Sequence, residues 1–255
     1  MDLGLNGKRA LVTGGSKGIG RAIVETLIAD GASVSFCART ESDVLAAVQD
    51  LRAAGATVYG ASLDVRDEAA FNAWVDKSAE LLGGIDILIS NVTTRIYSKG
   101  EAMWRDCFDV DFLQHVRVVN ACLPHLEQAK GGSVTIISSI ASVLTHLPPG
   151  EEGYGAMKAA LINYVGQMGA TQARKSIRFN AVSPGPVDFP GGFWDQVRQK
   201  SPAMFERAAS LAPLGRHATA QEVAAAAVFL ASPKASFITG ANLRVDGGGI
   251  KSANF

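Results

Sequence analysis

Thr13-Gly14-Gly15-Ser16-Lys17-Gly18-Ile19-Gly20 is a glycine-rich turn that follows a short run of apolar and β-branched residues at positions 9–13. Positions 21–29 come next and carry apolar side chains at a helical spacing. Strand, glycine turn and helix in this order open a dinucleotide-binding fold. Glycine lets the backbone bring a diphosphate against the helix N-terminus, where unpaired N–H groups stabilise negative charge. The alternative is a glycine-containing turn that binds no ligand.

Strands and helices alternate along the rest of the chain. This alternation predicts an α/β fold in which a doubly wound, mainly parallel sheet of seven strands has helices on both faces. No repeat or linker divides the chain, so we expect residues 1–255 to form one domain. The expected strands are 9–13, 33–37, 57–61, 85–89, 134–137, 178–182 and 242–245, and the expected helices are 21–29, 42–54, 68–82, 101–123, 153–173 and 220–230.

Residues 184–216 break this alternation. They hold five of the nine prolines and a pair of adjacent glycines. A long irregular insertion between a strand and a helix is usually a lid or a binding loop. Large apolar residues such as Phe193, Trp194 and Phe205 favour burial over a disordered connection. We therefore expect an irregular substrate lid here.

The composition is that of a globular protein with a large aliphatic core, because 47% of the 255 residues are hydrophobic and only 7% are aromatic. A formal net charge of zero gives no reason to expect nucleic acid or an anionic membrane as a partner, so we expect a small molecule. Cys37, Cys107 and Cys122 lack a paired spacing, which argues against disulfides and against a metal site. Without a signal pattern or an apolar run near ~18 residues, the chain is expected to be soluble and cytoplasmic.

Tyr154-Gly155-Ala156-Met157-Lys158 places a phenol and an ammonium four residues apart. On a helix the two side chains lie on one face, about one turn apart. The ammonium then lowers the pKa of the phenol, which makes the tyrosine a candidate general acid and base. The alternative is a chance pair on a partly exposed helix face.

The residues after the second expected strand decide which dinucleotide fits. Enzymes that use NAD usually have a carboxylate there, which binds the ribose 2′-hydroxyl and repels a 2′-phosphate. Here the strand ends in Cys37-Ala38-Arg39, and Lys17 lies in the glycine turn. Two cations without a carboxylate favour NADP(H), because arginine binds phosphate through charge-assisted hydrogen bonds. The alternative is that Arg39 is an ordinary surface residue.

These motifs and several others resemble the short-chain dehydrogenase/reductase family in order and spacing over nearly the whole chain. The resemblance implies a single Rossmann-type domain, usually in a homotetramer, that passes a hydride between a nicotinamide and a carbonyl or alcohol. The other motifs that carry it are Asp64-Val65, Asn91, Ser138-Ser139, Asn180-Ala181-Val182-Ser183-Pro184-Gly185, Ile238-Thr239-Gly240 and Val245-Asp246-Gly247-Gly248.

The resemblance also assigns roles to single residues. Tyr154 would give a proton to the carbonyl oxygen, Ser139 would hydrogen-bond the same oxygen, and Lys158 would hold the nicotinamide ribose. The expected cofactor-binding residues are Gly14, Ser16, Lys17, Gly18, Ile19, Gly20 and Arg39, then Asp64 and Val65 at the adenine and Asn91 in the cleft, with Tyr154, Lys158, Pro184, Gly185 and Val187 towards the nicotinamide.

Three positions depart from the family's pattern. Ser90-Asn91-Val92-Thr93 replaces the usual Asn-Asn-Ala-Gly, and Phe189 stands where many members have a threonine. Asp111 replaces the asparagine of the catalytic tetrad, and we include it among the candidate catalytic residues. If its side chain points into the proton relay, it should raise the pKa of both Lys158 and Tyr154. The alternative is a solvated helix residue.

The function expected from these residues is that of an NADP-dependent oxidoreductase acting on a ketone or secondary alcohol, similar to a 3-oxoacyl-thioester reductase or a small carbonyl reductase. The alternative is a non-catalytic NADP-binding sensor or regulatory protein with the same fold. The resemblance further implies a homotetramer that packs through helices 101–123 and 153–173 and through the C-terminal strand. Candidate contacts are Val116, Val119, Tyr164 and Met168.

Overall fold

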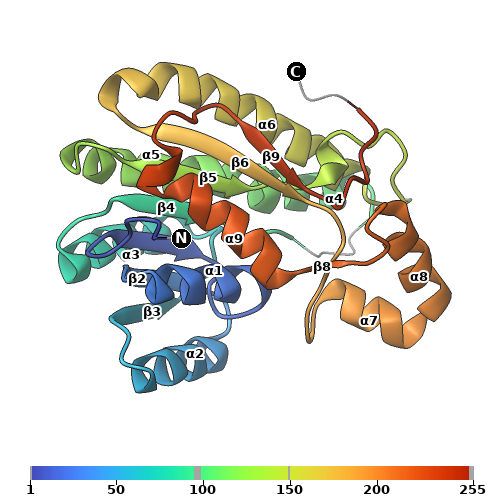
Figure 1. Cartoon of the computed structure of the whole chain (residues 1–255), viewed down its shortest axis with the longest axis horizontal. Coiled ribbons are helices and arrows are strands. Elements are labelled where there is room, and N and C mark those ends of the chain that lie inside the picture. Colours follow the sequence, from blue (N-terminus) through green and yellow to red (C-terminus); the bar gives the residue numbers. More distant parts are fainter. Residues whose placement is uncertain (1, 95–98, 149, 253–255) are drawn as a thin grey trace.

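A sheet of seven parallel strands forms the centre of the protein (Figure 1). The computed structural model describes residues 2–94, 99–148 and 150–252. The strand order is β3-β2-β1-β4-β5-β6-β9, which confirms the α/β, doubly wound, Rossmann-type sheet predicted from the sequence. The strands are β1 (Arg9–Thr13), β2 (Ser33–Ala38), β3 (Val58–Ser62), β4 (Ile87–Ser90), β5 (Ser133–Ile137), β6 (Arg178–Pro184) and β9 (Asn242–Val245).

The central strands are apolar along their whole length because helices cover both faces of the sheet. All five residues of β5 are buried, and so are all four of β4. In β1, Val12 pairs with Phe36 of β2 on one side and with Ile89 of β4 on the other. The chain moves outward from β1 through β2 to β3 and then returns to β4. A cleft is expected at the carboxyl ends of β1 and β4, where the order reverses.

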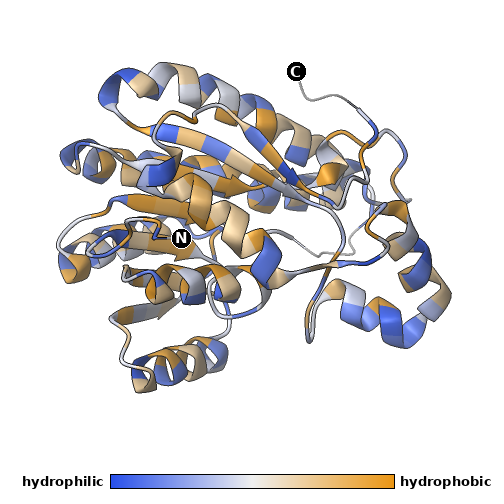
Figure 2. Ribbon diagram, in the orientation of Figure 1, coloured by the Kyte–Doolittle hydropathy of each residue, from blue (hydrophilic) through white to orange (hydrophobic). Residues whose placement is uncertain are grey.

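Two clusters of buried side chains lie on the two faces of the sheet. The ribbon coloured by hydropathy shows much of β4 and β5, in the centre of the sheet, as hydrophobic (Figure 2). One cluster includes Ile23 of α1 and Val223 of α9, together with side chains of α2. The other includes Phe71 of α3, Val118 of α5 and Leu161 of α6. The helices concerned are α1 (Gly18–Ala29), α2 (Glu41–Ala53), α3 (Glu68–Leu82), α5 (Gln114–Gln128), α6 (Glu152–Gln172) and α9 (Ala220–Ala231).

The helix expected at 101–123 is present, but it contains a π-helical turn and ends later than expected. The segment consists of α4 (Glu101–Phe108), a π-helical turn (Asp109–Leu113) and then α5. The π turn contains Asp111, and such turns occur often at functional sites. The helix also runs on past Pro124 to Gln128, since the buried Leu126 anchors the last turn in the core.

Residues 184–216 are more regular than the sequence analysis expected. They form β7 (Val187–Asp188), α7 (Phe193–Lys200) and α8 (Pro202–Leu211), and β7 pairs with β8 (Ala218–Thr219). An acidic residue in the first turn of α7 and basic residues in its last turn complement the helix dipole. Proline is well suited to the first position of α8. The two helices lie beside the carboxyl edge of the sheet (Figure 1), and we call residues 184–216 the lid.

Cys37, Cys107 and Cys122 are all buried and free, as their spacing predicted. Burial raises the pKa of the Cys107 thiol to about 11 and that of Cys37 to about 12. Both are therefore protonated thiols at neutral pH. Within the described ranges, no helix combines the length and the hydropathy needed to cross a membrane.

Candidate active site

The glycine turn is bound to the neighbouring strand by its backbone. The N–H groups of Gly14 and Gly15 donate to the carbonyl oxygen of Cys37, at 2.7 and 3.1 Å. A Cβ atom on Gly20 would lie 2.0 Å from the Gly14 oxygen, so only glycine fits where α1 meets the turn. The start of α1 has no side-chain cap and no acidic residue in its first turn. The open turn and the uncapped N-terminus fit a bound diphosphate.

Asn91 supports this turn from β4. Its backbone N–H donates to Thr13 Oγ1 at 2.9 Å, and its Nδ2 donates to the Thr13 carbonyl at 3.2 Å. Asn91 therefore lies against the glycine turn, and its amide nitrogen holds that turn in place. The tight turn that the family forms with Ala-Gly is replaced here by Val92 and Thr93, and Gln114 donates to the Val92 carbonyl at 3.2 Å.

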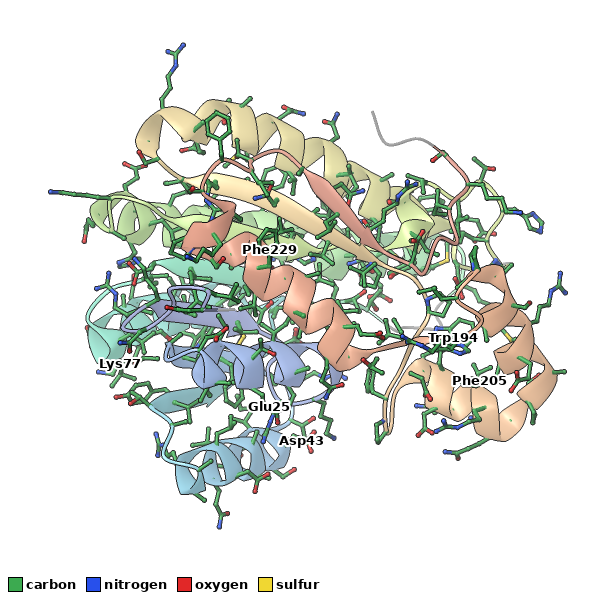
Figure 3. All side chains as sticks on the ribbon, viewed as in Figure 1. Glu25, Asp43, Lys77, Trp194, Phe205 and Phe229 are labelled. Atoms are coloured by element: carbon green, nitrogen blue, oxygen red, sulfur yellow. The ribbon has the colours of Figure 1, made fainter. Side chains whose placement is uncertain are left out.

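The residues expected to bind the adenosine end lie at the edge of the cleft. Arg39 and Asp64 are exposed, whereas Val65 is buried, so Val65 can offer a ligand little more than its backbone. Lys17 forms an ion pair of 2.8 Å with Asp43, a residue in the first turn of α2. Figure 3 labels Asp43 on this helix. The expectation of two cations without a carboxylate was therefore incomplete, because the fold brings Asp43 to Lys17.

Tyr154 and Lys158 lie one turn apart on α6, as their spacing predicted. The Lys158 side chain is 1% exposed, and its Nζ lies 5.6 Å from the centre of the Tyr154 ring. The same nitrogen donates to the carbonyl of Ile137 at 3.3 Å. The alternative of an exposed chance pair is wrong for the lysine. A charged group in this position interacts with the phenol through a medium of low dielectric constant.

The two adjacent serines after β5 have different roles. Ser138 is buried, and its hydroxyl donates to the backbone carbonyl of Lys158 at 3.1 Å. Ser139 is half-buried, and its Oγ accepts a hydrogen bond from the N–H of Ala141 at 3.1 Å. In that bond the Ser139 oxygen is the acceptor, so the bond does not use the hydroxyl proton of Ser139. This arrangement agrees with the choice of Ser139 as the candidate catalytic serine.

Asp111 is fully buried, so the alternative of a solvated helix residue is wrong. Its Oδ1 lies 3.6 Å from Lys158 Nζ. Burial raises the pKa of Asp111, while the charge of Lys158 and a hydrogen bond from Thr93 oppose that shift. Burial lowers the pKa of Lys158, and the charge of Asp111 opposes it. Asp111 therefore raises the pKa of Lys158 as expected, but burial is the larger effect and leaves the pKa of Lys158 below its ordinary value.

His115 is a buried residue of this region that the sequence analysis missed. Its Nδ1 lies 2.7 Å from the hydroxyl oxygen of Ser90, at the carboxyl end of β4. Burial, and then the charge of Lys158, hold the pKa of His115 well below its ordinary value. The ring is therefore neutral at physiological pH. Its position four residues after Asp111 was the available signal, because a regular helix would place the two side chains on one face.

The start of the lid lies directly against the glycine turn. Pro184 ends β6, and Gly185 donates from its N–H to the carbonyl of Val245 at 2.9 Å. Val187 is buried in the core, so only its backbone is available to a ligand. The ring of Phe189 covers Gly18, because a Cβ atom on this glycine would lie 2.6 Å from two ring carbons. A phenyl ring thus lines the cleft where the family usually has a threonine.

The remaining aromatic residues of the lid pack on each other. The ring of His217, the residue that directly follows the lid, stacks on Phe205 at 4.0 Å between centroids and lies 5.1 Å from Trp194. Figure 3 shows Trp194 and Phe205 within the lid. These ring contacts give the lid a small core of its own. That core explains why such a proline-rich segment is ordered.

The helix positions expected to contact another subunit are only partly exposed. Val119 is fully buried in the core of its own chain, so its proposed role in an interface was wrong. Tyr164 and Met168 pack at the edge of the same core. Phe108 of α4 is 44% exposed and forms a row of rings with Phe112 and Tyr164. An oligomer remains a prediction.

Comparisons with known proteins agree with this geometry. Residues 14–249 match the family described as enoyl-(acyl carrier protein) reductase. The chain is 37% identical over 251 residues to an isoepoxydon dehydrogenase of Penicillium expansum, covering 96% of this chain and 95% of the relative. The structure of L-sorbose reductase from Gluconobacter frateurii, complexed with NADPH and L-sorbose, has a TM-score of 0.89, 28% identity and coverage of 99% of this chain and 100% of that one.

A 7α-hydroxysteroid dehydrogenase, complexed with NADH and 7-oxo glycochenodeoxycholic acid, also has a TM-score of 0.89, with 27% identity and coverage of 99% of this chain and 98% of that one. The relatives therefore include a protein with bound NADPH and another with bound NADH. The match to the family extends over most of the chain, and the sheet order and the Tyr154-Lys158 helix agree with it. This chain belongs to the short-chain dehydrogenase/reductase family.

Proposed function

We propose that the protein is an NADP-dependent oxidoreductase that acts on a ketone or a secondary alcohol. The observation that carries this proposal is the buried ammonium of Lys158 beside the ring of Tyr154, on the same face of α6. When bound, the nicotinamide supplies or accepts the hydride. The glycine turn, with its uncapped helix N-terminus, is suited to hold the diphosphate of that cofactor.

The chemistry assigned to the protein is proton transfer at the substrate oxygen. A carbonyl oxygen gains negative charge as it is reduced, so it needs hydrogen-bond donors at that moment. Tyr154 gives its proton in reduction and takes one back in oxidation. The Ser139 hydroxyl donates a second hydrogen bond, and the positive charge of Lys158 favours the ionised phenol.

The preference for NADP(H) rests on Arg39 and Lys17 at the adenosine end. Arg39 follows β2 and is exposed, where its guanidinium is free to meet a phosphate. Lys17 is paired with Asp43, whose carboxylate would compete with a 2′-phosphate for its ammonium. The NADPH bound to L-sorbose reductase supports the proposal, whereas the NADH bound to the hydroxysteroid dehydrogenase means that family membership alone does not decide the cofactor.

The acid–base residues Tyr154 and Ser139 determine the class of substrate. Which substrate of that class is bound depends on the lid. Tyr154 and Ser139 together serve one oxygen atom, which suits a ketone or a secondary alcohol and includes 3-oxoacyl thioesters and small carbonyl compounds. A purely regulatory NADP-binding protein would not need a buried lysine beside the tyrosine, because burying an ammonium costs several kcal/mol. The oxidoreductase is therefore the reading we favour over a sensor.

The test compares the native protein with Tyr154→Phe. We expect the native protein to oxidise NADPH in the presence of at least one ketone from a panel of steroids, sugars, cyclic ketones and 3-oxoacyl thioesters. Removing the phenolic hydroxyl should lower kcat at least a hundredfold, in line with general acid catalysis, while the affinity for NADPH, measured by fluorescence, stays within about twofold. A Tyr154→Phe protein that keeps most of its rate would refute the assignment, and binding of NADPH without any turnover would favour the sensor.

A further inference from the structure

Two of the positions that depart from the family's pattern, Thr93 and Asp111, contact each other. The Thr93 hydroxyl donates to Asp111 Oδ1 at 2.5 Å. The backbone N–H of Thr94 donates to the same oxygen at 3.2 Å. This oxygen is also the atom that lies 3.6 Å from Lys158 Nζ. One carboxylate oxygen thus accepts hydrogen bonds from a hydroxyl and an amide and lies within ion-pair distance of an ammonium.

A buried carboxylate carries a negative charge and needs donors for two acceptor oxygens, whereas a buried carboxamide is neutral and has only one acceptor oxygen. Asp111 is fully buried, and an ionised group without water is strongly destabilised unless it is paired and hydrogen-bonded. The glycine that the family usually has at position 93 offers no side-chain hydroxyl. Aspartate at position 111 and threonine at position 93 therefore complement each other chemically, although 18 residues separate them in the sequence.

We propose that Thr93 is a positioning residue that holds Asp111 as a carboxylate with Oδ1 directed at Lys158, so that positions 93 and 111 act as one unit in the catalytic centre. The inference rests on the proposed function only for its effect on turnover. The contact itself is a property of the cofactor-free protein.

The charged and titratable neighbours of Asp111 come from each helix that packs around it. Lys158 faces it from α6, and Cys107 faces it from α4 as a neutral thiol. His115 lies one turn further along, on α5, and is neutral. Burial raises the pKa of Asp111, and the Lys158 charge, the Thr93 hydroxyl and the Thr94 N–H each lower it. Removing the hydroxyl should therefore raise the pKa of Asp111 further.

The competing explanation is that Thr93 only fills space. Thr93→Val keeps the shape of the side chain and removes the donor, whereas Thr93→Ser keeps the donor and removes a methyl group. Thr135→Val is the control for the same exchange of side chains: Thr135 is buried whereas Thr93 is exposed, but the Thr135 hydroxyl has no hydrogen-bond partner among the described residues. Thr93→Ala replaces the valine variant if the latter does not fold.

The first measurement uses the cofactor-free protein with 13C-labelled aspartate carboxyl groups. The signal of Asp111 is the one that disappears in Asp111→Asn. We expect its titration midpoint to move to higher pH in Thr93→Val, and to stay at the native value in Thr93→Ser and Thr135→Val. An unchanged midpoint in Thr93→Val, or a serine variant that behaves like the valine variant, overturns the proposal. This result does not depend on whether the protein is an oxidoreductase.

The second measurement is the pH profile of turnover. If the active form needs the Asp111 carboxylate, Thr93→Val should lose about tenfold in kcat near neutral pH and regain rate as the pH rises, because the carboxyl group then ionises. Thr93→Ser should restore the native profile. A loss of the same size at every pH would show a space-filling role and overturn the proposal. A native protein without any turnover would count against the proposed function, while the carboxyl titration would still decide the role of Thr93.

Discussion

Two lysine–aspartate pairs lie in the candidate site, one in its interior and one at its edge, and they differ most in their contact with water. Lys158 and Asp111 are 3.6 Å apart with side chains that are 1% and 0% exposed. Lys17 and Asp43 are closer, at 2.8 Å, but their side chains are 68% and 26% exposed. Water and salt screen the outer pair and hardly reach the inner one. The Lys158–Asp111 pair is therefore the more strongly coupled electrostatically, although its two charged atoms are farther apart.

Burying the two charged groups of the inner pair costs free energy of folding, and the exposed outer pair does not have this cost. Burial raises the pKa of Asp111 above its ordinary 3.8 and lowers the pKa of Lys158 below its ordinary 10.5. Both shifts mean that the ionised form of each group is less favourable in the folded protein than in the unfolded chain. Their mutual attraction offsets part of this cost. We infer that the inner pair is retained for chemistry, and that the outer pair is free to exchange partners.

The largest effect should come from breaking the inner pair at one end. Lys158→Met leaves the carboxylate of Asp111 buried without a counter-charge, and we expect a loss of about 3 to 5 kcal/mol in the free energy of unfolding at pH 7. The measurement is urea unfolding at matched protein concentration. The deficit should shrink at pH 5, because a folded-state pKa above the unfolded one makes the protonated carboxyl group increasingly favourable as the pH falls.

The double variant Lys158→Met with Asp111→Asn is the control for this experiment. It replaces both charges with neutral groups of similar size, so most of the lost stability should return. If the double variant is as unstable as Lys158→Met, packing of the lysine stem and not its charge accounts for the loss. The outer pair offers the contrast, since neutralising Asp43 should change the free energy of unfolding by less than about 1 kcal/mol.

A smaller effect is expected at the edge of the site, from Arg39. Changing Arg39 to Asp should weaken NADPH binding by about tenfold to a hundredfold, since it replaces a charged hydrogen bond with a repulsive carboxylate. The affinity for NADH should change much less. Isothermal titration with both cofactors measures the ratio. Arg174→Asp, a charge reversal at an exposed position just beyond α6, is the matched control, and a native protein that binds both cofactors equally would contradict the NADP(H) proposal.

The difference between the two pairs also shows which parts of the fold and of the site can be predicted from the sequence. The glycine turn, α1 and the seven strands could be predicted because their signals are local: glycine at fixed offsets, and continuous apolar runs where both faces of the sheet are covered. The sequence signal for Tyr154 and Lys158 was equally local, because the two residues lie four positions apart on one helix.

The remainder of the site depends on contacts that sequence spacing does not reveal. Asp43 meets Lys17 only because α2 packs beside the glycine turn, and Thr93 meets Asp111 across 18 residues. The direction of Asp111 could not be predicted because its helix contains a π turn, which rotates the residues after it relative to a regular helix. In the lid, proline and glycine concealed two short helices: α7 has terminal charges that complement its dipole, and α8 has a proline in its first turn.

The smallest predicted effect concerns Asp43, and it tests whether the outer pair can exchange partners. The carboxylate of Asp43 holds Lys17 at 2.8 Å and lies near the place proposed for the 2′-phosphate. Asp43→Asn removes a competitor for the ammonium and a source of repulsion, while an exposed ion pair is worth at most about 1 kcal/mol. NADPH affinity should therefore increase, by no more than about fivefold, and NADH affinity should stay constant because NADH has no 2′-phosphate. The gain should decrease as salt is raised from 0.05 to about 0.5 M, since screening weakens the repulsion in the native protein. A loss of NADPH affinity would mean that Asp43 orients Lys17 towards the phosphate and does not compete for it, and an equal gain for NADH would place the effect away from the 2′-position.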